Sequence, residues 1–222
     1  MWHLDADHER PAIDTGLVPN DVLAELYSKS RRKTIRRNLK RLSSSGNVET
    51  RLTNDASVIR ERATTFLELE AAGWKSDEGT ALKCNADERE FFLDTVDAFA
   101  QRGNAIFVEL LLDGKPIAST INLQSGQSVF AFKIGWNPEY AEFGPGTLVD
   151  YKLLANCRAE LPDVKLIDSC AAPNSYLDSI WPWKQRVGSG LFAVSRRGKA
   201  ISSTMMQLKL VKRGVAAAMQ NV

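Results

Sequence analysis

A glycine-framed turn between residues 137 and 147 is the segment of this chain best suited to bind an anion. It ends in FGPGT, residues 143–147, and opens a predicted helix. Gly144 and Gly146 lack a Cβ, so a ligand can approach the backbone closely, and Pro145 favours a helix start. The first N–H groups of that helix have no internal partner and lie at the positive end of its dipole. We expect a phosphate or pyrophosphate there, with an ordinary Gly-Pro-Gly turn as the alternative.

Two lysines are further candidates for contact with an anion. Lys133 lies within an apolar stretch, where a charged side chain must face solvent, a cleft or an anion, and we favour the cleft. Lys75 follows Trp74 in a predicted loop. It is a candidate for contact with an anionic substrate, although a loop lysine is more often simply solvated.

A dense run of basic residues, SKSRRKTIRRNLKR, lies in the first quarter of the chain. As a helix it has Ile35, Leu39 and Leu42 in one apolar stripe and cationic side chains over most of the remaining surface. One interpretation is a solvated face balanced by acidic neighbours. The other is a docking surface at Lys29–Arg41 for RNA, an anionic glycan or lipid, or coenzyme phosphates. No stacked aromatic side chains accompany the run, which argues against a platform for single-stranded bases.

Several catalytic chemistries are excluded by the residues present. The histidines are His3 and His8, both close to the N-terminus, so a Cys–His nucleophile pair built on Cys170 is not expected. We expect Cys170 to be a small packing residue. The three cysteines, with Cys84 and Cys157, lie far apart without CxxC spacing, which predicts reduced thiols and no metal site. The sequence also has no GxxxxGK[ST] phosphate-binding motif.

The composition is that of an ordinary soluble globular protein. The 222 residues are 44% hydrophobic and 25% charged, and the net charge of +2 does not by itself indicate a nucleic-acid partner. No apolar run approaches the roughly 18 residues of a transmembrane segment, so we predict a cytoplasmic protein. We expect an N-terminal tail over residues 1–20, one domain over 21–196, and a C-terminal extension over 197–222 that forms one more helix.

Helix signals fill the first half of the chain. Asn20-Asp21 is expected to cap a long helix that runs through Leu42. Asn54, Asp55 and Ser57 offer a second cap, for a helix that runs through Glu70. A short strand over residues 48–52 separates these two helices. A third helix is predicted over Asp87–Gln101, where apolar residues recur at helical spacing.

The pattern then changes from helices to strands. Strands are predicted over residues 105–112, 116–123 and 128–136, with Asp113-Gly114 as a hairpin turn between the first two. The glycine-framed turn and its helix follow. After them we expect a strand over 164–168, a short helix over 174–183 and a strand over 191–195.

This order of elements resembles the GNAT acyltransferase fold, a mixed α/β fold whose mostly antiparallel, twisted sheet of about six strands is flanked by helices. Several local motifs are similar to those of the CelD/FemAB-like branch of the GNAT superfamily. That branch has a basic helix before the core, a Trp-Lys segment, a segment that ends in a Pro-Gly helix start, and a DSCA segment followed by WP. The corresponding residues are Lys29–Arg41, Trp74-Lys75, Phe132–Trp136 with Gly144–Leu148, and Asp168–Ala171 with Ile180–Pro182.

The resemblance implies an acyl-CoA-dependent N-acyltransferase, with acetyl-CoA as co-substrate and an amine as acceptor. In GNAT proteins the strand before the glycine turn pairs with the pantetheine arm and stabilises the oxyanion, which implies Phe132 and Ile134 here. The following helix N-terminus takes the pyrophosphate, and the residues implied are Gly144, Pro145, Gly146, Thr147 and Leu148. The chain departs from the family at Ala141, where a Gln or Arg usually leads the turn. One phosphate donor is therefore unaccounted for.

The same resemblance implies candidates for proton transfer. Asp168 ends a buried strand beside the expected cleft and is the first candidate for an acid/base or amine-orienting role, with a loop cap as the alternative. Tyr176 lies in the region where many GNAT enzymes place a tyrosine that protonates the coenzyme thiolate. Lys133, with its side chain assigned to the cleft, is the third catalytic candidate. Trp74 and Lys75 are assigned to the substrate.

Two other functions stay open at this point. FemAB-type relatives use aminoacyl-tRNA as donor, and the basic run leaves that donor open for this chain. A non-catalytic module on a degenerate GNAT scaffold, with the basic run binding RNA or another polyanion, is the second. FemAB-like proteins commonly pair two GNAT-like units, so a second unit or a homodimer could supply a missing wall of the cleft. The sequence does not identify the acceptor or the acyl chain.

Overall fold

The computed structural model describes residues 2–72, 81–205 and 207, and the chain divides into two compact units. The larger unit is Pro11–Lys184, and the smaller unit combines Met1–Arg10 with Gln185–Val222. The single domain expected over residues 21–196 stays a prediction. The larger unit contains all of the residues discussed below as a candidate site.

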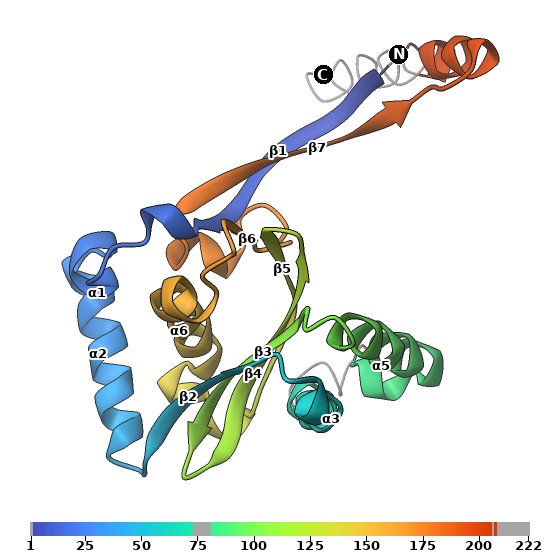
Figure 1. Cartoon of the computed structure of the whole chain (residues 1–222). Coiled ribbons are helices and arrows are strands. Elements are labelled where there is room, and N and C mark those ends of the chain that lie inside the picture. Colours follow the sequence, from blue (N-terminus) through green and yellow to red (C-terminus); the bar gives the residue numbers. More distant parts are fainter. Residues whose placement is uncertain (1, 73–80, 206, 208–222) are drawn as a thin grey trace, which may run out of the picture. The chain divides into compact units, whose positions relative to one another are not determined.

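The described part of the chain contains one sheet of seven strands in the order β2-β3-β4-β5-β6-β1-β7 (Figure 1). Neighbouring strands from β2 to β5 are antiparallel, β5 and β6 are parallel, and β6 and β1 are antiparallel. The strands are β1 (Trp2–Asp14), β2 (Val48–Thr53), β3 (Ala105–Leu112), β4 (Lys115–Ser125), β5 (Ser128–Trp136), β6 (Leu166–Asp168) and β7 (Trp183–Phe192). The predicted mixed α/β class is confirmed, with seven strands in place of about six.

Helices cover both faces of the sheet in the larger unit (Figure 1). On one face lie α1 (Val22–Leu26), α2 (Lys29–Ser43) and α6 (Pro145–Glu160), and on the other lie α3 (Ala56–Ala71) and α5 (Ala86–Ala100). Each layer has its own hydrophobic cluster. Ile35 and Leu42 of α2 pack with Leu148 of α6 in the first, and Phe66 of α3 packs with Phe92 of α5 in the second. Four short 3-10 helices complete the described elements: η1 (Thr15–Leu17), η2 (Leu82–Cys84), η3 (Pro138–Phe143) and η4 (Tyr176–Ser179).

The long first helix predicted through Leu42 is two helices in the structure. Ser28 begins α2 by accepting a hydrogen bond from the Arg31 N–H at 3.3 Å, so the chain starts a new helix there. Tyr27, between α1 and α2, has an extended backbone, and its buried hydroxyl donates to the Ile180 carbonyl at 2.8 Å. That distant hydrogen bond explains the break, because a local helix signal contains no information about it.

Two strands differ from the sequence-based expectation. Residues 2–14, predicted as a tail, form β1, whose end pairs with β6 through Ala12 opposite Asp168. The strand predicted at 191–195 is β7, which begins at Trp183, so the predicted helix over 174–183 shrinks to η4. In the smaller unit Arg186 of β7 forms an ion pair with Asp7 of β1, and residues 196–205 are helical.

The sheet opens between β5 and β6, and this opening prepares the candidate site. β6 is short, and its register with β5 ends at Phe130. Beyond Phe130 the described residues of β5 pair with β4 alone. An irregularity in that pairing sets Ile121 opposite Lys133 and Asn122 opposite Ala131, which leaves Phe132 as an extra residue. One edge of β5 is therefore available to a ligand.

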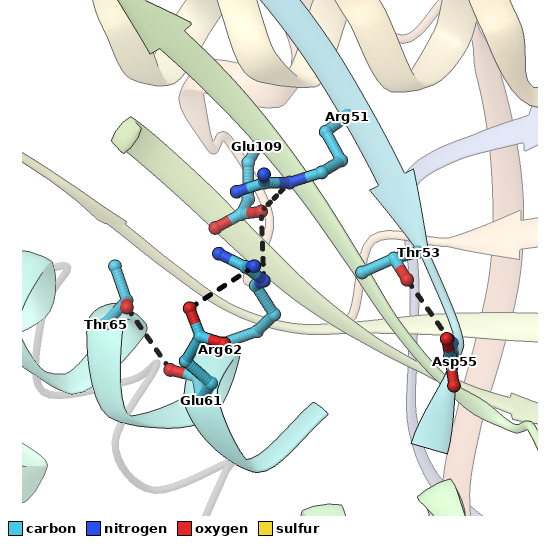
Figure 2. A network of polar contacts seen from close by, with 7 residues as sticks. All are labelled: Arg51, Thr53, Asp55, Glu61, Arg62, Thr65 and Glu109. Carbon is cyan, nitrogen blue, oxygen red and sulfur yellow. Dashed lines mark hydrogen bonds and ion pairs between the residues drawn. The ribbon is translucent and has the colours of Figure 1, made fainter. Parts of the chain in front are cut away.

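Buried polar contacts hold α3 against the face of the sheet that it covers together with α5. Figure 2 shows Arg51 of β2 and Arg62 of α3 approaching the buried Glu109 of β3. The Arg51 Nε atom donates to Glu109 Oε2 at 2.8 Å, and Arg62 Nε lies 4.0 Å from the same oxygen. The end of α3 contacts the sheet at Gly135 of β5. A Cβ on Gly135 would lie 2.8 Å from the backbone nitrogen of Glu70.

Gly135→Ala is expected to destabilise the protein by about 3 kcal/mol, because the clashing atoms belong to backbone and cannot move cheaply. Gly126→Ala is the matched control. Gly126 has φ +58°, and no atom lies within 4 Å of the place that a Cβ would take, so only backbone strain of about 1 kcal/mol is expected. Urea unfolding measures both variants. Equal losses of stability in the two variants would show that Gly135 is not in tight contact with α3.

Candidate active site

The glycine-framed turn forms the junction between η3 and α6. Gly144 has φ 61° and ψ 54°, a left-handed conformation that favours glycine. Its N–H donates to the Ala141 carbonyl at 3.0 Å, and its carbonyl accepts from the Leu148 N–H at 3.0 Å. The N–H groups of Gly146 and Thr147 belong to the first turn of α6 and have no acceptor within the helix. Together they form a helix end suited to an anion.

A cavity of about 280 Å³ opens beside this turn, and we call it the turn cavity. Its lining consists of Ile134, Trp136, Ala141, Gly144, Pro145, Gly146, Thr147 and Tyr176. A Cβ on Gly146 would lie 3.3 Å from Cδ1 of Trp136 and 3.4 Å from Cδ1 of Ile134, so any larger residue narrows the cavity. Most of the predicted cofactor-binding residues therefore come together here. Leu148 is different, because its side chain is 1% exposed and packs in the core.

A second cavity of about 210 Å³, the inner cavity, lies where β5 has separated from β6. It is lined by Thr120, Ala131, Phe132, Lys133, Ile134, Asp150, Ser169, Cys170, Ala171, Tyr176 and Leu177. Ile134 and Tyr176 line both cavities. Cys170, expected to be a packing residue, is exposed and contributes to this lining. A tyrosine hydroxyl on a shared wall can act on groups that approach from either side.

Tyr176 forms a hydrogen-bonded pair with Asp150 of α6. The phenol O–H donates to Asp150 Oδ2 at 2.6 Å, and the Asp150 side chain is buried. Burial raises the pKa of Asp150 to about 7, although the hydrogen bond from Tyr176 acts in the opposite direction. Burial also raises the pKa of Tyr176, and the nearby charge of Asp150 adds to that effect. A carboxyl group that titrates near neutral pH and touches a phenol is suited to proton transfer.

Sequence reasoning missed Asp150, although a signal for it existed. In α6 the residues at helical spacing after position 150 are Leu153, Leu154 and Cys157, all buried. A carboxylate at the start of such an apolar stripe is predicted to face the core, where it needs a partner. Trp181 also contacts this part of α6, because its indole N–H donates to the Asp150 backbone carbonyl at 3.4 Å.

Lys133 lies in the wall of the inner cavity. From the sequence we favoured a cleft as the place of this side chain. Its Nζ atom lies 3.3 Å from Oε1 of Glu70, which is buried at the end of α3. The other oxygen of Glu70 accepts from the Leu82 N–H at 2.9 Å. The charge of Lys133 is thus balanced by a carboxylate that is itself fixed, which suits a structural role in the wall.

Asp168 has a local role at the end of β6. Its Oδ1 atom accepts from the Cys170 N–H at 2.9 Å, and Cys170 has a positive φ of 51°. Neither cavity, as the described residues define it, includes Asp168 in its lining. These contacts match the loop-capping alternative. Trp74 and Lys75, the predicted substrate-binding residues, lie outside the described residues.

Two kinds of feature are absent from the described residues. They contain no group of three His, Cys, Asp or Glu side chains arranged to hold a metal ion. They also contain no helix with the length and apolar character needed to cross a membrane.

Comparison with solved structures shows a likeness of fold. FemX matches with a TM-score of 0.55 at 12% identity, covering 80% of this chain and 59% of FemX. The chain thus spans less than two thirds of FemX. A ribosomal-protein-alanine N-acetyltransferase from Brucella melitensis biovar Abortus 2308 matches with a TM-score of 0.37 at 17% identity, covering 62% of this chain and 88% of its own.

A third structure is the C-terminal domain of a putative lysylphosphatidylglycerol synthetase from Agrobacterium fabrum. Its TM-score is 0.46 at 10% identity, with 76% of this chain and 49% of that chain covered. No curated protein sequence matches the chain. The sequence model of the Acetyltransferase (GNAT) domain matches residues 29–185, which include the basic helix α2, the glycine-framed turn and Tyr176. The resemblance to the GNAT superfamily inferred from the separated motifs is confirmed, and the chain belongs to the GNAT acetyltransferase family.

Proposed function

We propose that the protein transfers an acyl group from an acyl-CoA to an amine, with the donor in the turn cavity and the amine in the inner cavity. The observation that carries this proposal is the Tyr176–Asp150 pair, because Tyr176 lines both cavities and its hydroxyl is bonded to a buried carboxyl group. A module that only binds RNA has no use for such a pair. The cytoplasmic location stays a prediction of the sequence alone.

The chain offers the donor two kinds of contact. The N–H groups of Gly146 and Thr147 can bind one phosphate at the positive end of α6, and the absence of a Cβ at Gly146 leaves room for it. The edge of β5 beyond Phe130 can accept an extended arm by hydrogen bonding, as in addition of a strand to a sheet. When bound, acyl-CoA supplies the thioester that reacts with the amine.

The amine requires a base, and the departing sulfur requires a proton. Ionised Asp150 accepts the proton that the amine loses when its nitrogen bonds to the acyl carbon. Tyr176 gives its hydroxyl proton to the sulfur as the carbon–sulfur bond breaks, and it recovers a proton from Asp150. The pair therefore ends in its initial state, and one proton has passed from nitrogen to sulfur. Asp150 takes the role that the sequence had suggested for Asp168.

An aminoacyl-tRNA donor is the second candidate, and the cationic face of α2 favours it. A hollow of about 680 Å³ on this helix is lined by seven lysine and arginine side chains. Such a surface binds a nucleic-acid backbone with strong salt dependence. We rank this donor second because the turn cavity and the open edge of β5 suit a small extended donor without it.

Gly146→Asp is expected to weaken acetyl-CoA binding at least about 100-fold, since it puts a negative side chain and extra bulk where the phosphates bind. Isothermal titration calorimetry measures the affinity. Thr64→Asp adds the same charge on the exposed face of α3, on the other side of the sheet, and is expected to bind like the wild type. Unchanged affinity in Gly146→Asp would reject the turn as the donor site. If the wild type binds tRNA but does not bind acetyl-CoA, the second candidate is favoured.

Tyr176→Phe is expected to lower kcat by about 10²- to 10⁴-fold, the usual contribution of a positioned acid. Acetyl-CoA affinity should change little, because the ring that forms the cavity wall stays. Tyr140→Phe removes the same hydroxyl from a tyrosine that packs on Phe143 outside both cavity linings, and full activity is expected. Steady-state kinetics on an amine acceptor provide the test, and equal rates for both variants would exclude Tyr176 as the acid.

Asp150→Asn is expected to show the buried carboxyl group in a stability profile that needs no substrate. The pKa of Asp150 is raised from 3.8 to about 7 on folding, so its ionisation opposes folding as pH rises between these values. The stability of the wild type relative to Asp150→Asn should therefore fall by up to about 4 kcal/mol from pH 4 to pH 8. Urea unfolding across this range measures the difference, and a constant difference would contradict the assigned pKa.

The catalytic rate should rise with pH as Asp150 ionises, whereas the stability falls over the same range. Because only the ionised carboxyl group accepts a proton, activity of the wild type is expected to rise with pH through about 7. The acceptor amine also loses its proton as pH rises. Asp150→Asn separates the two effects, since any remaining rise in the variant belongs to the amine.

A further inference from the structure

The cationic face of α2 has one end at the glycine-framed turn. The apolar side of α2 is fixed in the core through Ile35 and Leu42, so its basic side chains point outward. Seven of them, from Lys29 to Arg41, border the hollow of about 680 Å³. Arg41 is ion-paired with Glu142 of η3, and no ion pair joins the other six to an acidic side chain within the described residues. The helix carries a large excess of positive charge beside the proposed donor site.

Two residues at the C-terminal end of α2 lie beside the turn. The guanidinium carbon of Arg41 is 5.2 Å from the centre of the Phe143 ring, next to its ion pair with Glu142. The side-chain nitrogen of Asn38 lies 3.6 Å from the position that a Cβ on Gly144 would occupy. Lys29, twelve residues before Arg41, lies about 18 Å away along the helix axis. Only one end of the cationic face is therefore near the turn.

We propose that α2 is the second wall of the donor site and that Arg41, with Arg37 one turn earlier, binds the phosphates of acyl-CoA that the N-terminus of α6 does not reach. This inference rests on the proposed function. Acyl-CoA carries a pyrophosphate and a further phosphate on its ribose, whereas Gly146 and Thr147 together offer two backbone donors. Ala141 contributes no polar side chain to the turn. A cation from a neighbouring element is needed to balance the remaining charge.

Arg41 is suited to this task in its present contacts. Guanidinium groups bind phosphate through two parallel hydrogen bonds, and the Phe143 ring lies against the Arg41 group. Its partner Glu142 is exposed, with 59% of the side chain accessible. Because an exposed ion pair contributes little to stability, a phosphate can replace the carboxylate at low cost. The pair with Glu142 keeps Arg41 beside the turn until the donor binds.

A long polyanion would use the same helix differently. Its phosphates would contact the full length of α2, so that Lys29 and Arg41 would contribute about equally. A small donor held at the turn depends on Arg41 and not on Lys29. The two ends of one helix therefore provide a matched comparison, because each loses one charge on substitution by glutamine.

The experiment measures CoA binding by calorimetry at several salt concentrations for the wild type, Arg41→Gln and Lys29→Gln. Arg41→Gln is expected to weaken binding about 10-fold and to lower the slope of log affinity against log salt by about one, the effect of losing one phosphate contact. Lys29→Gln is expected to stay within about twofold of the wild type. Glu142→Gln, which frees Arg41, should bind CoA as well as the wild type or better.

Each other result decides against the inference. Equal weakening in Arg41→Gln and Lys29→Gln would show a diffuse polyanion surface, and wild-type affinity in Arg41→Gln would show that Arg41 does not touch the donor. If the wild type binds no CoA, the proposed function fails and this inference fails with it. If the wild type binds CoA and Gly146→Asp does not, while Arg41→Gln binds normally, the proposed function stands and this inference alone is wrong. Thermal unfolding of each variant checks that the fold is intact.

Discussion

The separation of β5 from β6 after Phe130 is the constraint on which the rest of the candidate site depends. The backbone N–H and C=O groups along the open edge of β5 must find partners in water or in a ligand, because β6 has ended. Asp168 ends β6 by capping the turn at Cys170, and the tight contact of Gly135 with α3 fixes β5 from the other side. Both cavities lie along the stretch of β5 that these contacts leave open, and residues of α6 line each of them.

Burying the Asp150 carboxyl group costs free energy, and its location in the fold offers a reason for this burial. An apolar side chain at this position of α6 would pack among Leu153 and Leu154 without losing hydration of a charge. The carboxyl group instead receives the hydroxyl of Tyr176 from η4, and so α6 is joined to the segment after β6 at the edge of the opening. Under the proposed function this destabilising group is retained because its raised pKa lets it both accept and return a proton near neutral pH.

The sequence was sufficient for elements whose signals are local. Asp55, one of the predicted caps, accepts the Ser57 N–H at the start of α3, and Asp113-Gly114 makes its hairpin. β1 could not be predicted because its partner β6 lies about 150 residues away, and its charged residues and Pro11 do not favour a strand. The glycine-framed turn and Tyr176 were candidates from motifs and from the family resemblance, and they line one cavity in the structure. The apolar stripe of α6 could have indicated that Asp150 is buried. Its contact with Tyr176 could not be predicted, because it depends on packing between distant segments.

The two electrostatic parts of the site differ in how salt acts on them. Arg41 and its neighbours on α2 are exposed, so their attraction for phosphate is screened over about 8 Å at physiological ionic strength. Asp150 is 4% exposed and contacts the Tyr176 hydroxyl directly at 2.6 Å, so salt screens this contact much less. Under the proposed function, salt therefore acts more on the capture of the donor than on proton transfer. We expect rising ionic strength to increase KM for the donor more than it changes kcat, a separation that follows from where each charge lies in the fold.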